Sequence, residues 1–149
     1  MHSVEFTDQA LKQMYEFGQT NKTEEICALL IGEKIPGGGG NIHYVCSEVR
    51  PIENVLHDPV RYEFNPQQFF DELQDTSYFE RSNTLDFIGV YHTHPNHHPI
   101  PSMIDLTESG YAGVYVIYSP KYDTYGYYHV TKAKEAWSSI NVEHLKEIA

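Results

Sequence analysis

A histidine-rich segment follows an apolar run and reads GVYHTHPNHHPIPSMID over residues 89–105. Four of the nine histidines lie within seven residues of it, and the first two, His92 and His94, are separated by one residue. On a β-strand, residues i and i+2 point to the same face about 6.6 Å apart, so these two imidazoles can bind one metal ion. Pro95 ends the strand, which places the pair at a strand end accessible to substrate.

Asp105 is the candidate for a third ligand, because catalytic zinc sites use three protein ligands and leave one position for water. It lies eleven residues after His94. Three prolines stiffen the loop between them: Pro95, Pro99 and Pro101. If a helix begins at Ser102, the i, i+3 spacing places Ser102 and Asp105 on the same side of its first turn.

Each of these features also has a simpler explanation. Two histidines separated by one residue occur on many strands without function, and SMID, residues 102–105, is a capping box that stabilises a helix start. His97 and His98 could be ligands too, but adjacent side chains diverge in most backbone conformations, so we interpret them as rim residues. Taken together, the features favour metal binding.

A catalytic metal of this kind needs a carboxylate beside it. Zinc lowers the pKa of bound water from about 15.7 to about 7, and a nearby carboxylate can take the released proton to the leaving group. Glu24 and Glu25 stand directly before the apolar run ICALLIG, residues 26–32. Strand alternation lets only one of the two point inward, and spacing alone does not choose between them. A polar flank without chemistry is the alternative.

Helices and strands alternate along the chain. Thr7 is a plausible N-cap for a helix over residues 7–19, with Ala10, Leu11, Met14, Tyr15 and Phe17 as its apolar stripe. A second helix is predicted from Asn65 and Pro66, and a short one in residues 141–149. Strands are predicted over 26–32, 41–52, 60–64, 85–94, 113–120 and 122–130, with the glycines 37–40 as a hairpin tip. This order predicts a mixed α/β fold in a single domain, residues 1–149.

Composition excludes some classes of partner. The 149 residues carry a formal charge of −11, which disfavours nucleic acid and favours a protein with a basic face, unless the charge serves only solubility. No stretch approaches the roughly 20 apolar residues that span a bilayer, and the N-terminus lacks signal-peptide features. We therefore expect no membrane partner and a cytoplasmic location. Cys27 and Cys46 lie in apolar runs and are expected to be buried, inert thiols.

The composite motif of EICALLIG followed by HTHPNHHPIPSMID resembles the JAMM, or MPN-plus, family of zinc metalloproteases. The resemblance covers roughly residues 5–131, is closest to the compact archaeal and bacterial type, and implies the MPN/JAMM, cytidine-deaminase-like architecture. It implies that Zn²⁺ is bound by His92, His94 and Asp105. It also implies that Glu25, two places before Cys27, is the general acid/base, and that Ser102 helps to hold an oxyanion. Ala28 replaces the family's usual glycine, which affects only local packing.

The resemblance also implies a substrate. Family members with the full motif hydrolyse the isopeptide or peptide bond after the Gly-Gly tail of ubiquitin-like or sulfur-carrier proteins. Residues 66–85 occupy the place of a substrate-facing insertion, which we expect to grip the modifier. The alternative is that Phe69, Phe70 and Leu73 simply pack this helix on the sheet. The sequence leaves the natural modifier and the oligomeric state open.

Three other functions compete with this interpretation. Other HxH hydrolases, which act on amides or phosphoesters, carry the motif near the N-terminus of barrels of about 250 residues, unlike this chain. A non-catalytic MPN-type module could bind a ubiquitin-like protein without needing Glu25. A cysteine peptidase using Cys27 is disfavoured, because a nucleophilic thiol needs an exposed, electropositive setting.

Overall fold

The computed structural model describes residues 2–77, 85–108, 110–131 and 137–142. Eight strands form one mixed sheet in the order β7-β6-β5-β4-β2-β3-β1-β8. The strands are β1 (Ser3–Phe6), β2 (Cys27–Pro36), β3 (Ile42–Ile52), β4 (Asp86–Thr93), β5 (Gly113–Ser119), β6 (Thr124–Val130), β7 (Trp137–Ser139) and β8 (Asn141–Val142). The helices are α1 (Asp8–Gly18), α2 (Pro66–Ser77) and α3 (Met103–Glu108), with a short 3₁₀ turn, η1, at Gly38–Gly40. In the described part of the chain, no helix is long and apolar enough to cross a membrane.

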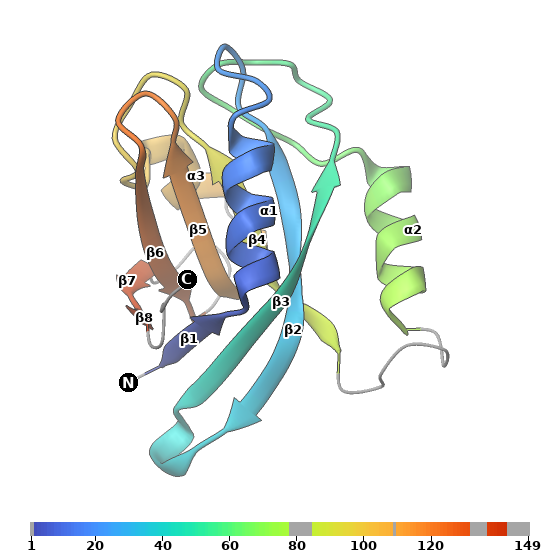
Figure 1. Ribbon diagram of the computed structural model, residues 1–149, viewed down its shortest axis with the longest axis vertical. Coiled ribbons are helices and arrows are strands. Elements are labelled where there is room, and N and C mark those ends of the chain that lie inside the picture. The colour runs from blue at the N-terminus through green and yellow to red at the C-terminus, as the bar shows by residue number, and fades with distance from the viewer. Residues whose placement is uncertain (1, 78–84, 109, 132–136, 143–149) are drawn as a thin grey trace.

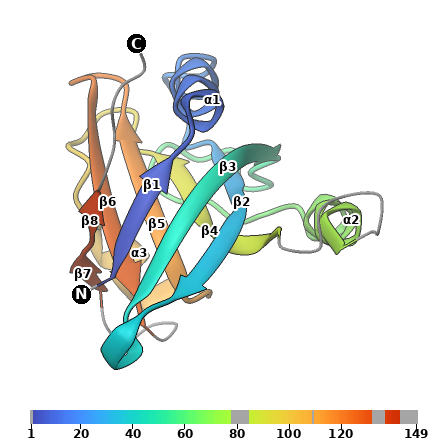
Figure 2. The same ribbon diagram turned by 60° about the horizontal axis from the view of Figure 1, so that its bottom comes forward.

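The sheet is strongly curled, and helices cover both of its faces (Figures 1 and 2). Strand β2 contributes side chains to the hydrophobic clusters on both faces of the sheet. Ala28 and Leu30 join the cluster that packs against α1, whereas Cys27, Leu29 and Ile31 join the one that packs against α2. Because the side chains of a strand alternate, this doubly buried strand must be apolar throughout, as the run ICALLIG is. These results confirm the predicted mixed α/β class.

Helix α1 begins as predicted. The Thr7 hydroxyl accepts a hydrogen bond from the Ala10 amide at 3.1 Å, and Ala10 and Met14 are fully buried. Tyr15 is an exception to the expected stripe, because its side chain is 48% exposed. Helix α2 also begins as expected, with the Asn65 side chain accepting hydrogen bonds from the amides of Gln67 and Gln68.

Two local predictions differ from the structure, and two short strands, β1 and β7, lie outside the predicted ones. Residues 60–64 do not form a strand and make only an isolated bridge between Phe64 and Asn54, because side-chain and main-chain hydrogen bonds close this segment into a loop. Strand β1, which pairs in parallel with β3, was not predicted. Within the predicted C-terminal helix, residues 141–142 pair with β1 as a strand, and residues 143–149 lie outside the described residues.

Because the sheet is curled, His129 of β6 lies against Tyr44 of β3 and against His2, near the N-terminus of the chain. Its Nε2 lies 2.9 Å from the Tyr44 hydroxyl, and its ring stacks on His2 with centroids 3.9 Å apart. Burial, aided by the charge of His2, lowers the pKa of His129 from 6.5 to about 4. Folding therefore favours the neutral imidazole.

This arrangement predicts a pH dependence of stability. Because the folded-state pKa is depressed, the unfolded chain binds the extra proton first, and stability falls as the pH drops from about 6.5 toward 4. His129→Gln should show a weaker fall over this window than the wild type in urea unfolding at several pH values. Equal slopes for the two proteins would contradict the assignment.

Candidate metal centre

His92 and His94 lie at the end of β4, near the middle of the sheet. His92 pairs with Cys27 of β2 and with Ile117 of β5, so the strand is flanked on both sides at this point. The two side chains are 0% and 4% exposed, and their ring centroids are 5.1 Å apart. The pair therefore occupies one face of the strand, as its i, i+2 spacing predicts.

Asp105, in the first turn of α3, faces both imidazoles. Its Oδ2 lies 3.0 Å from His94 Nε2, and its Oδ1 lies 3.2 Å from His92 Nε2. Burial alone would raise the pKa of Asp105, but the charge of His92 and hydrogen bonds from His94 and the Ser102 amide hold it well below its usual range. The carboxylate is therefore ionised and lies between the two nitrogens.

Glu25 approaches the same point from the residues before β2. Its Oε2 lies 4.0 Å from His94 Nε2, and the ligand atoms of Glu25, His92 and His94 lie within 4.8 Å of one another. Glu25 is only 3% exposed, whereas the Glu24 side chain is 35% exposed and contacts His57. Burial, with the charges of Asp105 and Asp58, raises the pKa of Glu25 to about 9 in the metal-free chain.

The polar atoms of this cluster fit a metal ion. Among the described residues, Glu25 Oε1 and both ring nitrogens of His92 are buried without a hydrogen-bond partner. The 3.2 Å contact of His92 Nε2 with Asp105 thus lacks hydrogen-bond geometry. Buried polar atoms without partners are costly, and a cation bound between these side chains would give His92 Nε2 a partner. Two imidazole nitrogens with carboxylate oxygens are a donor set that zinc favours.

Contacts outside the cluster orient His94. Its Nδ1 lies 2.9 Å from the His98 carbonyl oxygen, which can only accept, so Nδ1 carries a proton and Nε2 is the ring nitrogen that faces Asp105. The His98 ring stacks on Tyr122, with centroids 3.9 Å apart. His97 and His98 are both exposed, and neither belongs to the cluster. No residue type or spacing in the sequence marks the role of the His98 carbonyl.

The proline-rich loop lies firmly against β6. The Tyr128 hydroxyl donates a 2.7 Å hydrogen bond to the Pro99 carbonyl oxygen. Gly126 approaches the same oxygen so closely that an added Cβ would collide with it. The loop therefore holds its position between His94 and α3 through contacts with β6 as well as through its prolines.

Ser102 and Asp105 form a reciprocal capping box. The Asp105 amide donates to Ser102 Oγ at 3.0 Å, and the Ser102 amide donates to Asp105 Oδ2 at 2.9 Å. The structural explanation of SMID is therefore correct, and it does not compete with a role at the site, because the same bonds aim Asp105 at the histidines. Since Ser102 Oγ accepts from an amide, its own proton remains available for donation.

A substitution at Ser102 separates these two roles. Ser102→Ala removes the cap and should lower the free energy of unfolding by about 0.5–2 kcal/mol. If the hydroxyl also donates to a reacting oxygen, kcat should fall by about 100-fold or more. Ser102→Asp is the matched control, because it keeps a capping acceptor but has no hydroxyl proton. It should regain stability in thermal melts without regaining kcat, and full activity in either variant would exclude the hydroxyl from the reaction.

Tyr62 is a neighbour of the cluster that sequence spacing does not reveal. Its ring stacks on His92, with centroids 4.6 Å apart and an interplanar angle of 29°. It also lines a pocket of about 440 Å³ that adjoins Asp105. The walls of this pocket combine aromatic side chains, such as Phe64 and Tyr111, with charged ones, such as Arg61 and Glu108. A recess of mixed polar and apolar character therefore lies directly beside the candidate metal centre.

Neither cysteine is placed to act as a nucleophile. Cys27 and Cys46 are fully buried, and burial raises the pKa of each thiol above its usual value. A thiolate at either position would be strongly disfavoured near neutral pH. The geometry therefore gives no support to a cysteine peptidase.

Comparison with known proteins agrees with the geometry. Two curated proteins named desampylase are similar to this chain. The one from Haloferax volcanii is 29% identical over 115 residues, which are 76% of this chain and 75% of that protein. The one from Pyrococcus furiosus is 30% identical over 87 residues, 58% of this chain and 53% of that protein.

Two solved structures share the fold. Protein DSY2949 from Desulfitobacterium hafniense superposes with a TM-score of 0.68 at 20% identity, covering 96% of this chain and 93% of that one. AF2198, a JAB1/MPN domain protein from Archaeoglobus fulgidus, gives a TM-score of 0.58 at 20% identity, with 94% and 97% coverage. Residues 7–137 match the family described as prokaryotic homologs of the JAB domain. With this match spanning most of the sequence, the chain belongs to that compact prokaryotic branch of the JAMM/MPN family.

Proposed function

We propose that this protein is a zinc-dependent metallo-isopeptidase that releases ubiquitin-like or sulfur-carrier proteins at their Gly-Gly tails. One observation carries the proposal. Buried side chains from three separate elements converge on one point, and Glu25 and His92 bring polar atoms there that have no partner among the described residues. Natural folds rarely keep such atoms except where a ligand or a reaction uses them.

The proposed roles follow from the contacts. His92, His94 and Asp105 would hold the zinc ion, which supplies Lewis acidity and a bound water with a pKa near 7. Glu25, whose ionised form a bound zinc ion would favour, would accept a proton from the attacking water at Oε2, the oxygen nearest His94, and deliver it to the departing amine. Ser102 would stabilise the developing oxyanion by donating a hydrogen bond from its hydroxyl group. Burial of Glu25 keeps this carboxyl away from bulk water between the two transfers.

The substrate class rests on the relatives and on charge. The curated relatives are named desampylases, and the family resemblance implies modifiers with a flexible Gly-Gly tail. The net charge of −11 favours a modifier with a basic face over nucleic acid.

In α2, Phe69 packs in the core against Phe64, whereas Phe70 is 55% exposed. We assign Phe70 to modifier contact, and residues 78–84 of the expected insertion lie outside the described residues. The cytoplasm remains the proposed location.

A non-catalytic binding module is the alternative function. Such a module would gain nothing from a carboxyl buried next to two imidazoles, since burial of a carboxyl without a full set of hydrogen bonds is costly. The burial of Glu25 therefore favours the enzyme. A phosphoesterase shares the metal but differs in the substrate that it cleaves.

The decisive test uses defined substrates. The protein is incubated with a Gly-Gly-ended ubiquitin-like protein joined to a lysine side chain, with the same protein as a linear fusion, and with a phosphodiester. We expect cleavage of the modifier substrates, loss of cleavage with a chelator, and recovery with added zinc. Binding of the modifier without cleavage would favour the binding module, and cleavage of only the phosphodiester would favour the other hydrolase class.

A further inference from the structure

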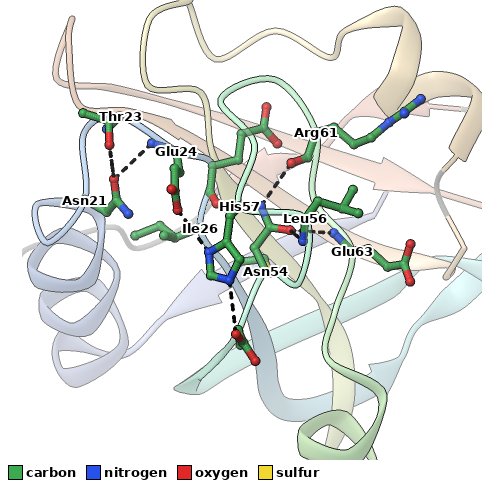
Figure 3. A network of polar contacts seen from close by, with 12 residues as sticks. Asn21, Thr23, Glu24, Ile26, Asn54, Leu56, His57, Arg61 and Glu63 are labelled. Atoms are coloured by element: carbon green, nitrogen blue, oxygen red, sulfur yellow. Dashed lines mark hydrogen bonds and ion pairs between the residues drawn. The ribbon is translucent and has the colours of Figure 1, made fainter.

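Asn54 lies at the centre of a polar network beside the candidate metal centre (Figure 3). It lies two residues past the end of β3 and is 5% exposed. Its Nδ2 donates to the carbonyl oxygens of Glu25, at 2.9 Å, and Arg61, at 3.0 Å. Its Oδ1 accepts from the amides of Leu56 and Glu63, both at 3.0 Å. One buried amide thus makes four hydrogen bonds, all to main-chain groups.

These bonds close residues 54–64 into a loop that holds Glu25 by its backbone. The Glu25 carbonyl oxygen accepts from Asn54, and the Glu25 amide donates to the Asp58 carbonyl oxygen at 2.9 Å. Both main-chain polar groups of Glu25 are therefore bound to the same loop. Because β2 begins only at Cys27, no strand ladder fixes Glu25, and the loop supplies what the sheet does not.

The next residue is fixed from the opposite side. The Ile26 amide donates to Thr93 Oγ1, and the Thr93 amide donates to the Ile26 carbonyl oxygen, both at 3.0 Å. Thr93 stands between the two histidines of the cluster. The segment carrying Glu25 is thus held between the histidine strand and the loop closed by Asn54.

The same loop contacts the cluster a second time. Tyr62, eight residues after Asn54, stacks on His92, and the hydrogen bonds of Asn54 to its neighbours Arg61 and Glu63 fix the backbone on each side of it. The loop therefore sets the position of one carboxyl by backbone hydrogen bonds and supports one imidazole by stacking. Both contacts, the hold on the Glu25 backbone and the stacking of Tyr62 on His92, therefore depend on the hydrogen bonds made by Asn54.

We propose that Asn54 is a positioning residue, which holds the Glu25 carboxyl at the distance from His94 that proton transfer requires. This inference rests on the proposed function. The two N–H groups of Nδ2 position Glu25, because they donate to the carbonyl oxygens of Glu25 and Arg61. Oδ1 accepts from Leu56 and Glu63 and so organises the loop itself. Asn54→Asp keeps Oδ1 and the side-chain shape but places a second acceptor against two carbonyl oxygens. Asn54→Ala removes all four bonds.

The test compares these two variants with Asn21→Asp. Asn21 lines the same pocket as Glu25 and Asn54, and its Oδ1 only accepts, from the amides of Thr23 and Glu24 and from the Thr23 hydroxyl. Asn21→Asp therefore adds the same charge nearby without losing a donor. Steady-state kinetics on the modifier isopeptide, zinc content and amide hydrogen exchange are measured on the full chain for each protein.

We expect kcat to fall by about 10- to 100-fold in both Asn54 variants, with KM within about twofold and zinc content unchanged, because small misplacements of a reacting group are costly. Asn21→Asp should match the wild type. Exchange of the Glu25 amide should accelerate in both Asn54 variants. The Leu56 and Glu63 amides should lose protection in Asn54→Ala, whereas Asn54→Asp should retain it. This pattern would separate positioning of Glu25 from general loosening of the loop.

Several results would overturn the inference. Wild-type kcat in a folded Asn54→Asp would exclude the role of Nδ2, and an equal loss in Asn21→Asp would assign the effect to charge. A loss of kcat that follows the loss of zinc, or failure of both Asn54 variants to fold, would make Asn54 structural. If the wild type itself cleaves no modifier, the proposed function fails instead, and unchanged exchange at Glu25 would then reject the positioning role separately.

Discussion

Glu25→Gln is expected to retain about one zinc ion per chain and to cleave the modifier substrate about 1,000-fold more slowly than the wild type. The substitution keeps the size of a side chain that is 97% buried but removes its ability to accept and return a proton. The proposed zinc ligands are His92, His94 and Asp105, so metal binding should persist. Zinc analysis of the purified variant and single-turnover cleavage measure the two quantities independently.

Glu24→Gln is the matched control for this substitution. Glu24 is the adjacent carboxylate, but it is partly exposed and contacts His57 rather than the histidine cluster. The Glu24→Gln variant should cleave the modifier substrate at a rate within about twofold of the wild type, because surface substitutions away from a site usually have small effects. If Glu25→Gln cleaves as fast as the wild type, the carboxyl plays no part in proton transfer and the proposed mechanism is wrong.

His94→Asn is expected to bind zinc more than 100-fold more weakly and to show no cleavage above background. Even the partners that orient metal ligands change metal affinity by about 10- to 100-fold, so a direct ligand should matter more. The loss also leaves Asp105 Oδ2 without its 3.0 Å contact to an imidazole. Competition with a chromogenic zinc chelator measures the affinity, and the cleavage assay measures the consequence.

His97→Asn provides the comparison for this second prediction. His97 lies in the same loop but is exposed, unlike the buried residues of the cluster. Zinc affinity and activity should both remain close to those of the wild type. Equal zinc loss in the two variants would show that the loop, rather than the His94 ring, determines metal binding.

The sequence predicted the members of the cluster better than the way in which they are held. Strand alternation correctly placed His92 and His94 on one face, and the i, i+3 spacing correctly joined Ser102 to Asp105. The choice between Glu24 and Glu25 came from the family resemblance. Which of two adjacent carboxylates turns inward depends on the register of β2 against β4, where Cys27 faces His92, and on the loop beyond it.

The supporting residues could not be predicted, because they act through the main chain and over long sequence separations. The His98 carbonyl, which fixes the His94 tautomer, is a group that every residue carries, so no residue type marks it. Asn54 binds Glu25 across 29 positions. Residues 60–64 have strand-like composition, yet the hydrogen bonds of Asn54 draw them into a loop, since tertiary contacts override weak β-propensity.

The core of the fold followed from pattern, and its exceptions have physical causes. The run ICALLIG is buried on both faces, as a central strand between two helical layers must be. Tyr15 falls outside the buried stripe of α1 but still contacts Tyr118 edge-on at 6.2 Å between ring centroids, so its aromatic face is partly used. The short strand β1 carried too few residues to show a period.

X-ray absorption at the zinc edge of the metal-loaded protein tests the central claim most directly. Convergence of His92, His94 and Asp105 on one ion predicts two imidazole nitrogens at about 2.0–2.1 Å with the remaining ligands oxygen, and Asp105→Asn should abolish this signal. A sulfur ligand at about 2.3 Å, or a spectrum without imidazole scattering, would place the metal elsewhere and contradict the proposed site.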